Sequence, residues 1–149
     1  MRSRLLTALV VWLATNFGLP ANFDHPSIVF VPPTQMALLF REEIAREQET
    51  GVSAAETDSE IVSLYNKDLK TIYLSEGWTG KTPAELSILV HEMVHHLQNV
   101  GGLKFACPQE REGLAYGAQE RWLGLFGRDL LSDFQMDAFT ILVKSHCFL

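Results

Sequence analysis

Two histidines four residues apart, with a glutamate directly after the first, are the residues of this chain best suited to chemistry. They are His91, Glu92 and His95, in the sequence His-Glu-Met-Val-His. On an α-helix, residues i and i+4 lie one above the other, so both imidazoles can reach the same metal ion. Glu92 is rotated by about 100° from His91 and need not be a ligand. The segment therefore predicts two zinc ligands and a neighbouring general base.

This combination of residues is suited to hydrolysis. A zinc ion lowers the pKa of a water that it binds to about 7 and polarises a carbonyl group. A neighbouring carboxylate, here Glu92, can take the proton of that water as the hydroxide attacks the carbonyl. A metal-dependent hydrolase is the leading interpretation, and a chance occurrence of the motif is its alternative.

The flanking residues predict that the motif lies in the middle of a helix. Upstream, Thr82-Pro83-Ala84-Glu85 has the form of a capping box with proline at the first helical position. The helix is expected to end at Gly101-Gly102. Between these limits, apolar residues recur at helical spacing, at Leu86, Leu89, Val90, Met93, Val94 and Leu97.

A third ligand is expected downstream, because catalytic zinc usually takes three protein ligands. The metzincin spacing would require a glycine at position 98 and a histidine at position 101, where this chain has Gln98 and Gly101. A second predicted helix offers carboxylates, and we choose Glu112 as the ligand. The alternatives on the same helix are Glu110 and Glu120. The small residues Gly113, Gly117 and Ala118 are expected to let this helix approach the first one closely.

At these residues the chain resembles the gluzincin branch of the zincin-like metallopeptidases. In that group an H-E-x-x-H helix is followed by a glutamate ligand on a second helix, often in an E-x-x-A motif. The matching residues are His91, Glu92, His95 and Glu112. The resemblance extends over roughly residues 71 to 123, and it includes small bacterial zincin-like proteins of unassigned function. Tyr116 stands where that group often has aspartate, which leaves open the residue that partners a metal-binding histidine.

Three runs of residues have the pattern of β-strands. They are Ser27–Val31, Ile61–Tyr65 and Thr71–Ser75, and the last two form a predicted hairpin that turns at Asn66-Lys67-Asp68. We expect an α+β fold with a small, mostly antiparallel sheet of about three strands packed on the active-site helix, and four or five helices. The resemblance implies that an edge strand aligns a peptide substrate, and Thr71–Ser75 is our candidate for that edge; an ordinary structural hairpin is the alternative.

The length and composition predict a single domain over residues 1–149, with 47% hydrophobic residues and a net charge of −6. An acidic chain disfavours nucleic acid as a partner. The N-terminal residues have the charged and apolar regions of a signal peptide, but they also form a helical stripe over about 3–17 that is too short to cross a bilayer. A retained helix is the preferred interpretation and would fit a cytoplasmic protein, whereas a signal peptide would mean export.

Cys107 and Cys147 are the only cysteines. They are expected either to pair, which would imply an oxidising compartment, or to remain two buried thiols. No C-x-x-C spacing supports a role as zinc ligands. Three further residues are candidates for steadying the oxyanion of a hydrolytic reaction, with packing or surface roles as the alternative: Tyr73, Tyr116 and His146.

The predicted function is zinc-dependent hydrolysis of a peptide or protein substrate, with Glu92 as the general base. Two alternatives differ in class: a zinc-dependent hydrolase of a non-peptide bond, and a catalytically silent zinc-binding interaction module. A purely structural zinc site needs no base and usually fills all four positions with protein ligands. The presence of Glu92 therefore favours a catalytic site.

Overall fold

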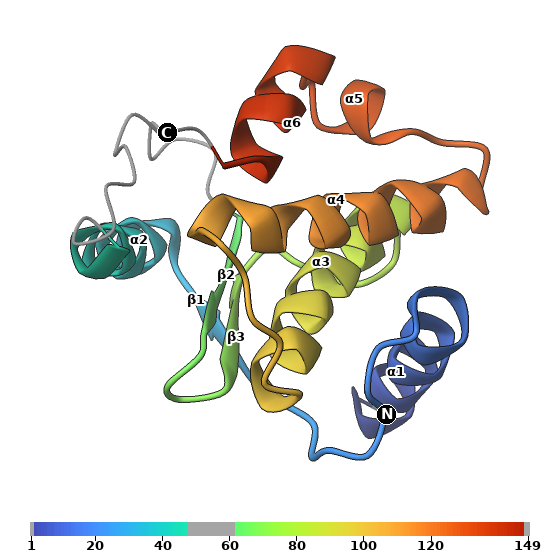
Figure 1. Ribbon diagram of the computed structural model, residues 1–149, viewed down its shortest axis with the longest axis horizontal. Helices are drawn as coiled ribbons and strands as arrows, with labels where there is room; N and C mark the ends of the chain where they lie inside the picture. The colour runs from blue at the N-terminus through green and yellow to red at the C-terminus, as the bar shows by residue number, and fades with distance from the viewer. Residues whose placement is uncertain (1, 48–61, 148–149) are drawn as a thin grey trace.

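The computed structural model describes residues 2–47 and 62–147, and in these residues the chain has an α+β fold (Figure 1). The fold class agrees with the expectation, although the described part contains six helices rather than four or five. The additional short helix, α5, has four residues, too few to produce a helical pattern in the sequence. The elements are α1 (Arg2–Phe17), β1 (Ser27–Val31), α2 (Pro33–Glu47), β2 (Ser63–Asn66), β3 (Thr71–Ser75), α3 (Pro83–Val100), α4 (Pro108–Gly124), α5 (Leu130–Asp133) and α6 (Ala138–Ser145).

The three strands form a mixed sheet in the order β1-β3-β2. Strand β1 pairs with β3 in parallel, from Ser27 opposite Thr71 to Val31 opposite Ser75, and β2 pairs with β3 in antiparallel fashion. Two expectations are therefore wrong. The sheet is not mostly antiparallel, and Thr71–Ser75 is the central strand rather than an edge. A central position suits β3 because its Ile72 side chain is fully buried.

The predicted hairpin between β2 and β3 is present. Asn66 ends β2, and its Oδ1 accepts a hydrogen bond from the backbone N–H of Leu69 at 2.9 Å. Lys70 then takes a positive φ of 49° before β3 begins. Strand β2 starts at Ser63, whereas Ile61, part of the predicted strand, lies outside the described residues.

Helix α3 begins and ends where its sequence signals indicate. The Thr82 side chain accepts a hydrogen bond from the backbone N–H of Glu85, and Pro83 opens the helix. The Glu85 carboxylate does not return to Thr82. It accepts instead from the Thr79 hydroxyl and from backbone N–H groups of residues 79–81. The helix stops before Gly101, and Gly102 has a positive φ of 67°, which glycine adopts without strain.

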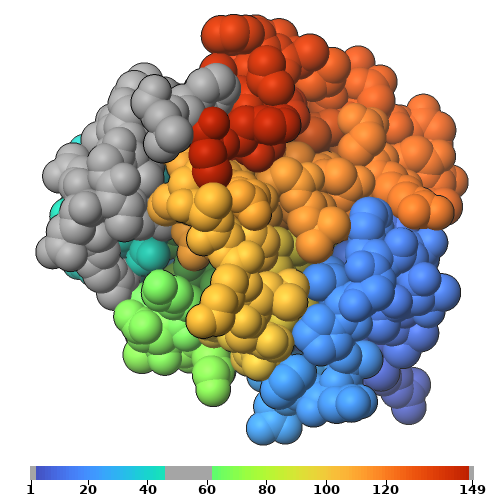
Figure 2. Space-filling view, viewed as in Figure 1, coloured from blue at the N-terminus to red at the C-terminus, as the bar shows by residue number. Residues whose placement is uncertain are grey.

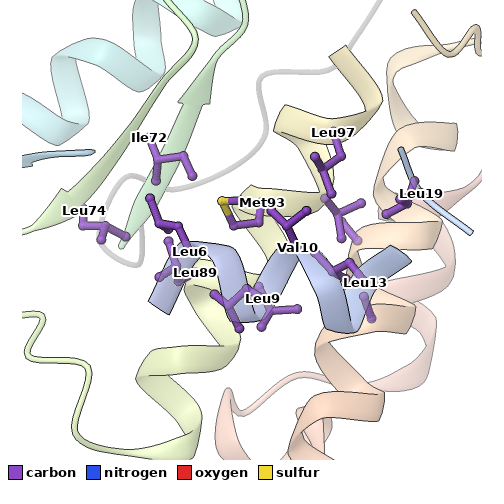
Figure 3. Packing of buried hydrophobic residues seen from close by; sticks show 14 residues of the cluster. Leu6, Leu9, Val10, Leu13, Leu19, Ile72, Leu74, Leu89, Met93 and Leu97 are labelled. Atoms are coloured by element: carbon purple, nitrogen blue, oxygen red, sulfur yellow. The ribbon is translucent and has the colours of Figure 1, made fainter. Parts of the chain in front are cut away.

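The core lies where α1, α3 and β3 meet (Figure 3). The side chains of α1 that point into it are those of the predicted N-terminal helical stripe, and they contact the buried face of α3. In the part of the chain that the structure describes, no helix has both the length and the apolar character needed to span a bilayer. The main members of this core are Leu6, Leu9, Val10, Leu13, Ile72, Leu74, Leu89, Val90, Met93, Val94 and Leu97.

Helices α3 and α4 pack closely and run in opposite directions (Figure 1). Ala115 and Ala118 are fully buried at this contact. Gly113 and Gly117 were expected to lie at this contact too, and this expectation is wrong. A Cβ built on Gly113 would meet Ser145 of α6, and one built on Gly117 would meet nothing within 4 Å. The glycines therefore face the C-terminal segment, and alanines provide the close approach to α3.

Candidate metal centre

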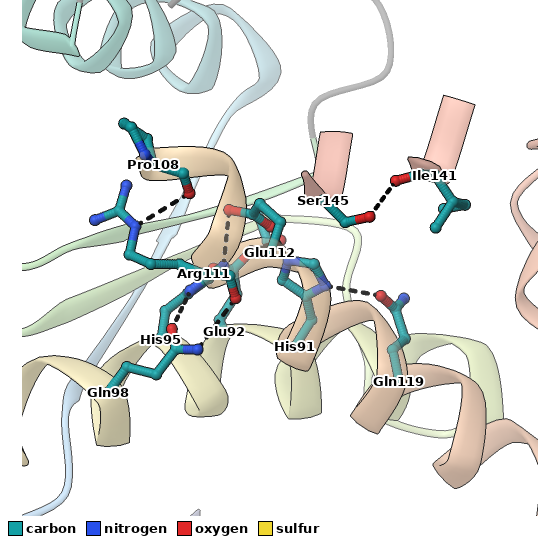
Figure 4. Close-up of polar contacts among 11 residues, drawn as sticks. His91, Glu92, His95, Gln98, Pro108, Arg111, Glu112, Gln119, Ile141 and Ser145 are labelled. Atoms are coloured by element: carbon teal, nitrogen blue, oxygen red, sulfur yellow. Dashed lines mark hydrogen bonds and ion pairs between the residues drawn. The ribbon is translucent and has the colours of Figure 1, made fainter. Parts of the chain in front are cut away.

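Three side chains from two helices converge on one point. His91 and His95 of α3 point toward Glu112 of α4 (Figure 4). The Nε2 atom of His91 lies 2.9 Å from Glu112 Oε1, and that of His95 lies 3.0 Å from Glu112 Oε2. One potential ligand atom from each residue falls within 4.8 Å of the other two. The structure thus brings together the three residues that the sequence selects as metal ligands.

This donor set fits a zinc ion. Imidazole nitrogen and carboxylate oxygen are both zinc ligands, with bond lengths of about 2.0–2.2 Å. A tetrahedral arrangement with such bonds separates neighbouring ligand atoms by about 3.3 Å. The two Glu112 oxygens lie 2.9 and 3.0 Å from the Nε2 atoms of His91 and His95, a few tenths of an ångström less than this separation. The three potential ligand atoms therefore lie at separations close to those of a zinc site.

Gln119 orients the first histidine. Its Oε1 lies 2.9 Å from His91 Nδ1, and its Nε2 donates to the Ser87 hydroxyl at 3.2 Å. Ser87 donates its own proton to the carbonyl oxygen of Ala84, so it can only accept from Gln119. These hydrogen-bond directions fix the orientation of the Gln119 amide, with its Oε1 toward His91. His91 Nδ1 must therefore carry the proton and donate it to Gln119 Oε1. The Nε2 atom of His91 is the one directed at the metal centre.

Gln98 orients the second histidine in the same way. Its Nε2 donates to the backbone carbonyl of Arg111 at 3.1 Å, and its Oε1 faces His95 Nδ1 at 2.9 Å. A carbonyl oxygen can only accept, so the amide cannot be reversed, and His95 Nδ1 also donates. Metal-binding histidines usually donate their second N–H to a carboxylate, a backbone carbonyl or water. Here two glutamine amides take that role.

Glu112 and the two histidines also interact electrostatically. Burial lowers the pKa of His95, but the charge and hydrogen bond of Glu112 outweigh burial and raise the pKa to about 9. Burial raises the pKa of Glu112, but the charge of His95 and the hydrogen bonds from both histidines hold that pKa well below its usual range. Both shifts have the same cause, the close contact between Glu112 and the imidazoles, and a metal ion bound there would displace the proton of His95.

Glu92, the predicted base, is buried beside this centre, with 7% of its surface exposed. It is near enough to His95 for its charge to contribute to the raised pKa of that imidazole. Its Oε2 accepts a hydrogen bond of 2.5 Å from the hydroxyl of Ser63, in strand β2. Strand β2 thus helps to hold the Glu92 carboxylate in place.

The other predicted site residues lie in different positions. The Tyr116 ring packs edge-on against His91, with 4.8 Å between ring centroids. Tyr73 is in the central strand, and His146 is exposed at the end of α6, where its Nδ1 lies 3.1 Å from the carbonyl oxygen of Leu142. His146 is thus not part of the three-residue cluster.

The two alternative ligands are also outside the cluster. Glu110 accepts a hydrogen bond from the backbone N–H of Ala106, and Glu120 accepts one from that of Leu130. Glu110 therefore binds the segment just before its own helix α4, and Glu120 binds the first residue of α5. Cys107 and Cys147 form a disulfide, with 5.9 Å between Cα atoms, which resolves the two alternatives for these cysteines.

Gln98, Gln119 and Ser63 were not predicted as site residues. For the glutamines a signal was present. Gln98 lies three residues after His95, one turn further on the same helix, and Gln119 lies on the helical face of Glu112. Ser63 left no local signal, because it reaches Glu92 only through the packing of β2 on α3.

The fold and the centre define an α+β protein in which two antiparallel helices present two histidines and one glutamate to a common point. Residues 1–149 match the model of the family DUF6647, described as a domain of unknown function, and the chain belongs to this family. Comparison with curated proteins found no match, and neither did comparison with solved structures.

Proposed function

We propose that this protein is a zinc-dependent hydrolase of peptide bonds. The observation that carries the proposal is the convergence of His91, His95 and Glu112 on one point, with the buried carboxylate of Glu92 beside it. Two nitrogen ligands, one oxygen ligand and a separate carboxylate are the elements that a hydrolytic zinc site requires. The gluzincin resemblance of the same four residues supports this assignment.

Each residue has a distinct role in this proposal. His91, His95 and Glu112 hold the ion, and Gln98 and Gln119 keep the imidazoles in the correct tautomer. The ion, when bound, supplies a Lewis acid that acidifies water and polarises a carbonyl group. Glu92 takes a proton from the attacking water and later donates it to the leaving amine. Tyr116 lies at the edge of the centre, where its ring packs against that of His91.

A structural zinc site is the main competing assignment. Such a site usually has four protein ligands, whereas the cluster in the described residues has three histidine or carboxylate members. This leaves a position for water or substrate.

Strand β2 is the candidate for holding substrate backbone, in place of the central strand β3. Among the described strands, β2 pairs only with β3 and is therefore an edge strand. Its Ser63 contacts Glu92 directly. A peptide added to this edge would be held mainly through its backbone and would lie near the base.

The test compares the wild type with Glu92→Gln, which preserves the size of the side chain. Zinc content is measured on protein purified without chelator, and hydrolysis is measured with a mixed peptide library read by mass spectrometry. We expect about one zinc per chain in both proteins and a loss of about 10²- to 10⁴-fold in rate for the variant. Glu76→Gln, at an exposed position, is the matched control. A Glu92→Gln variant that hydrolyses peptides like the wild type would refute the assignment.

A further inference from the structure

A pocket of about 330 Å³ lies between α4 and the C-terminal helices. Figure 2 shows the C-terminal segment, in red, lying against α4, in orange. The volume is at the small end of the range for ligand pockets, about 300–1,000 Å³, and suits one side chain rather than a large ligand. Its walls include Gly113, Tyr116 and Gly117 of α4, Leu130 and Leu131 from α5, and Ile141 from α6.

Two residues connect this pocket to the metal centre. Tyr116 lines the pocket, and its ring also packs edge-on against His91. Gly113 lines the pocket too, and it directly follows Glu112 in the chain. Tyr116 is therefore common to the pocket and to the surroundings of the metal centre.

The walls are mainly apolar, and the absence of side chains at two positions of α4 creates the space. Gly117 is exposed, and a Cβ built there would meet nothing within 4 Å. Glycine inside a helix costs roughly 1 kcal/mol relative to alanine. Gly117 lines the pocket, so a larger side chain at this position would reduce the pocket volume.

The charged group in the lining is Glu120. It is exposed, and its Oε1 already accepts a hydrogen bond from the backbone N–H of Leu130 at 3.3 Å. This carboxylate caps the start of α5. The pocket interior is thus left to Leu130, Leu131 and Ile141, whose side chains favour an aliphatic occupant.

We propose that this pocket binds an aliphatic side chain of the substrate, of the size of leucine, while the adjacent carbonyl group lies at the metal centre. The proposal rests on the proposed function, because it assigns the substrate class of the same site. The C-terminal segment would then determine specificity. Its position on α4 is held by the disulfide between Cys107 and Cys147 and by the contact of Ser145 with Gly113.

The test uses small hydroxamic acids, which chelate zinc, so that it does not depend on hydrolysis. Acetohydroxamic acid has no side chain, 4-methylpentanohydroxamic acid carries an aliphatic chain, and 5-aminopentanohydroxamic acid carries a cationic one. Their dissociation constants are measured by titration calorimetry on the zinc-loaded full chain. We expect the aliphatic probe to bind roughly 10- to 100-fold more tightly than acetohydroxamic acid, from burial of its additional carbons.

The variant Gly117→Leu fills the pocket, and Gly124→Leu is its matched control. Both glycines are exposed in α4, and neither would bring a Cβ within 4 Å of another atom, so both variants should fold. Gly124 does not line the pocket. We expect Gly117→Leu to abolish the additional affinity for the aliphatic probe, with zinc content unchanged, and Gly124→Leu to retain it.

The outcomes separate this proposal from the proposed function. If the wild type binds acetohydroxamic acid and the aliphatic probe with equal affinity, the pocket assignment is overturned while the metal centre remains in place. A greater gain from the cationic probe would overturn the aliphatic assignment and identify Glu120 as the determinant. Loss of the additional affinity in Gly124→Leu as well would also overturn it. Zinc-loaded protein that binds none of the three probes would overturn both proposals.

Discussion

The Oε1 atom of Gln119 lies 2.9 Å from Nδ1 of His91, on the opposite side of the imidazole from Glu112. Glu112 and Gln119 are two turns apart on α4, so a single helix holds the ring from both sides. The partner is an amide and carries no charge. It orients the histidine without the added basicity that a carboxylate partner would give.

The first prediction concerns this amide. Replacing Gln119 with leucine removes the acceptor for His91 Nδ1–H and leaves that group unpaired in a partly buried site. Zinc affinity should fall by about 10- to 100-fold. The measurement is competition against a chromophoric chelator at fixed pH. Gln119→Glu keeps an acceptor for His91 Nδ1–H but loses the donor to Ser87, so its zinc affinity should fall less than that of Gln119→Leu.

Gln35→Leu, at an exposed position of α2, is the control for these variants and should bind zinc like the wild type. Equal zinc affinities in the Gln119→Leu variant and the wild type would show that His91 is positioned by its packing against Tyr116 alone.

The second prediction concerns the base. Ser63→Ala removes the hydroxyl that donates to Glu92 Oε2, and the carboxylate is then less well positioned for proton transfer. We expect kcat for peptide hydrolysis to fall about tenfold, equivalent to about 1.4 kcal/mol in the barrier, with KM nearly unchanged. Zinc content should remain about one per chain, since Ser63 contacts no ligand of the cluster.

Ser63→Thr keeps the hydroxyl and should restore most of the activity. A result in which both variants lose zinc would instead indicate that Ser63 supports the fold of the centre. Steady-state kinetics and zinc analysis on the same preparations distinguish the two roles.

The features that the sequence predicted are those that depend on one helix and its ends. The spacing of His91, Glu92 and His95 places them on adjacent faces of α3, and Thr82 and Gly101 mark the limits of that helix. Glu112 followed from its place near the start of the next helix. Such inferences succeed because helical geometry relates near neighbours in the chain.

The features that were missed depend on contacts between distant segments. The parallel pairing of β1 with β3 makes β3 central, and nothing within Thr71–Ser75 records a partner that is separated from it by α2 and β2. The contact of Gly113 with Ser145 likewise depends on the return of the C-terminal segment to α4. A glycine in a helix pattern indicates a close approach or an open space, but not which neighbour is involved.

The third prediction concerns the disulfide. Cys107 precedes α4 and Cys147 follows α6, with a sequence separation of 40 residues. Constraint of a loop of this size in the unfolded chain should stabilise the protein by about 4 kcal/mol. We expect the double variant Cys107→Ala and Cys147→Ala to lose this amount in urea unfolding followed by tryptophan fluorescence.

The wild type measured in the presence of a reducing agent is the control, and it should lose the same stability. Zinc content of the double variant should be unchanged, because the ligands are held by the contact between α3 and α4. A loss of less than about 1 kcal/mol in both measurements would contradict the prediction.

The last prediction concerns the start of the helix that carries the histidines. The hydrogen bond from the Thr79 hydroxyl lowers the pKa of Glu85 below its ordinary value of 4.5. Burial opposes this shift, and hydrogen bonds from the backbone N–H groups of residues 79–81 lower the pKa further. A lowered pKa in the folded state means that the folded chain binds fewer protons than the unfolded one. The stabilisation is therefore complete above pH 4.5 and is lost as pH falls through the folded pKa.

The Glu85→Gln variant should be less stable than the wild type by about 1 kcal/mol at pH 7, the order of the net contribution of a hydrogen bond. The difference between the two proteins should shrink as the pH falls from 5 toward 3, in buffers whose range covers about that interval. Urea unfolding at several pH values gives both free energies of unfolding. A difference that grows on acidification would mean that Glu85 is protonated in the folded state, which its hydrogen bonds from Thr79 and Gly80 oppose.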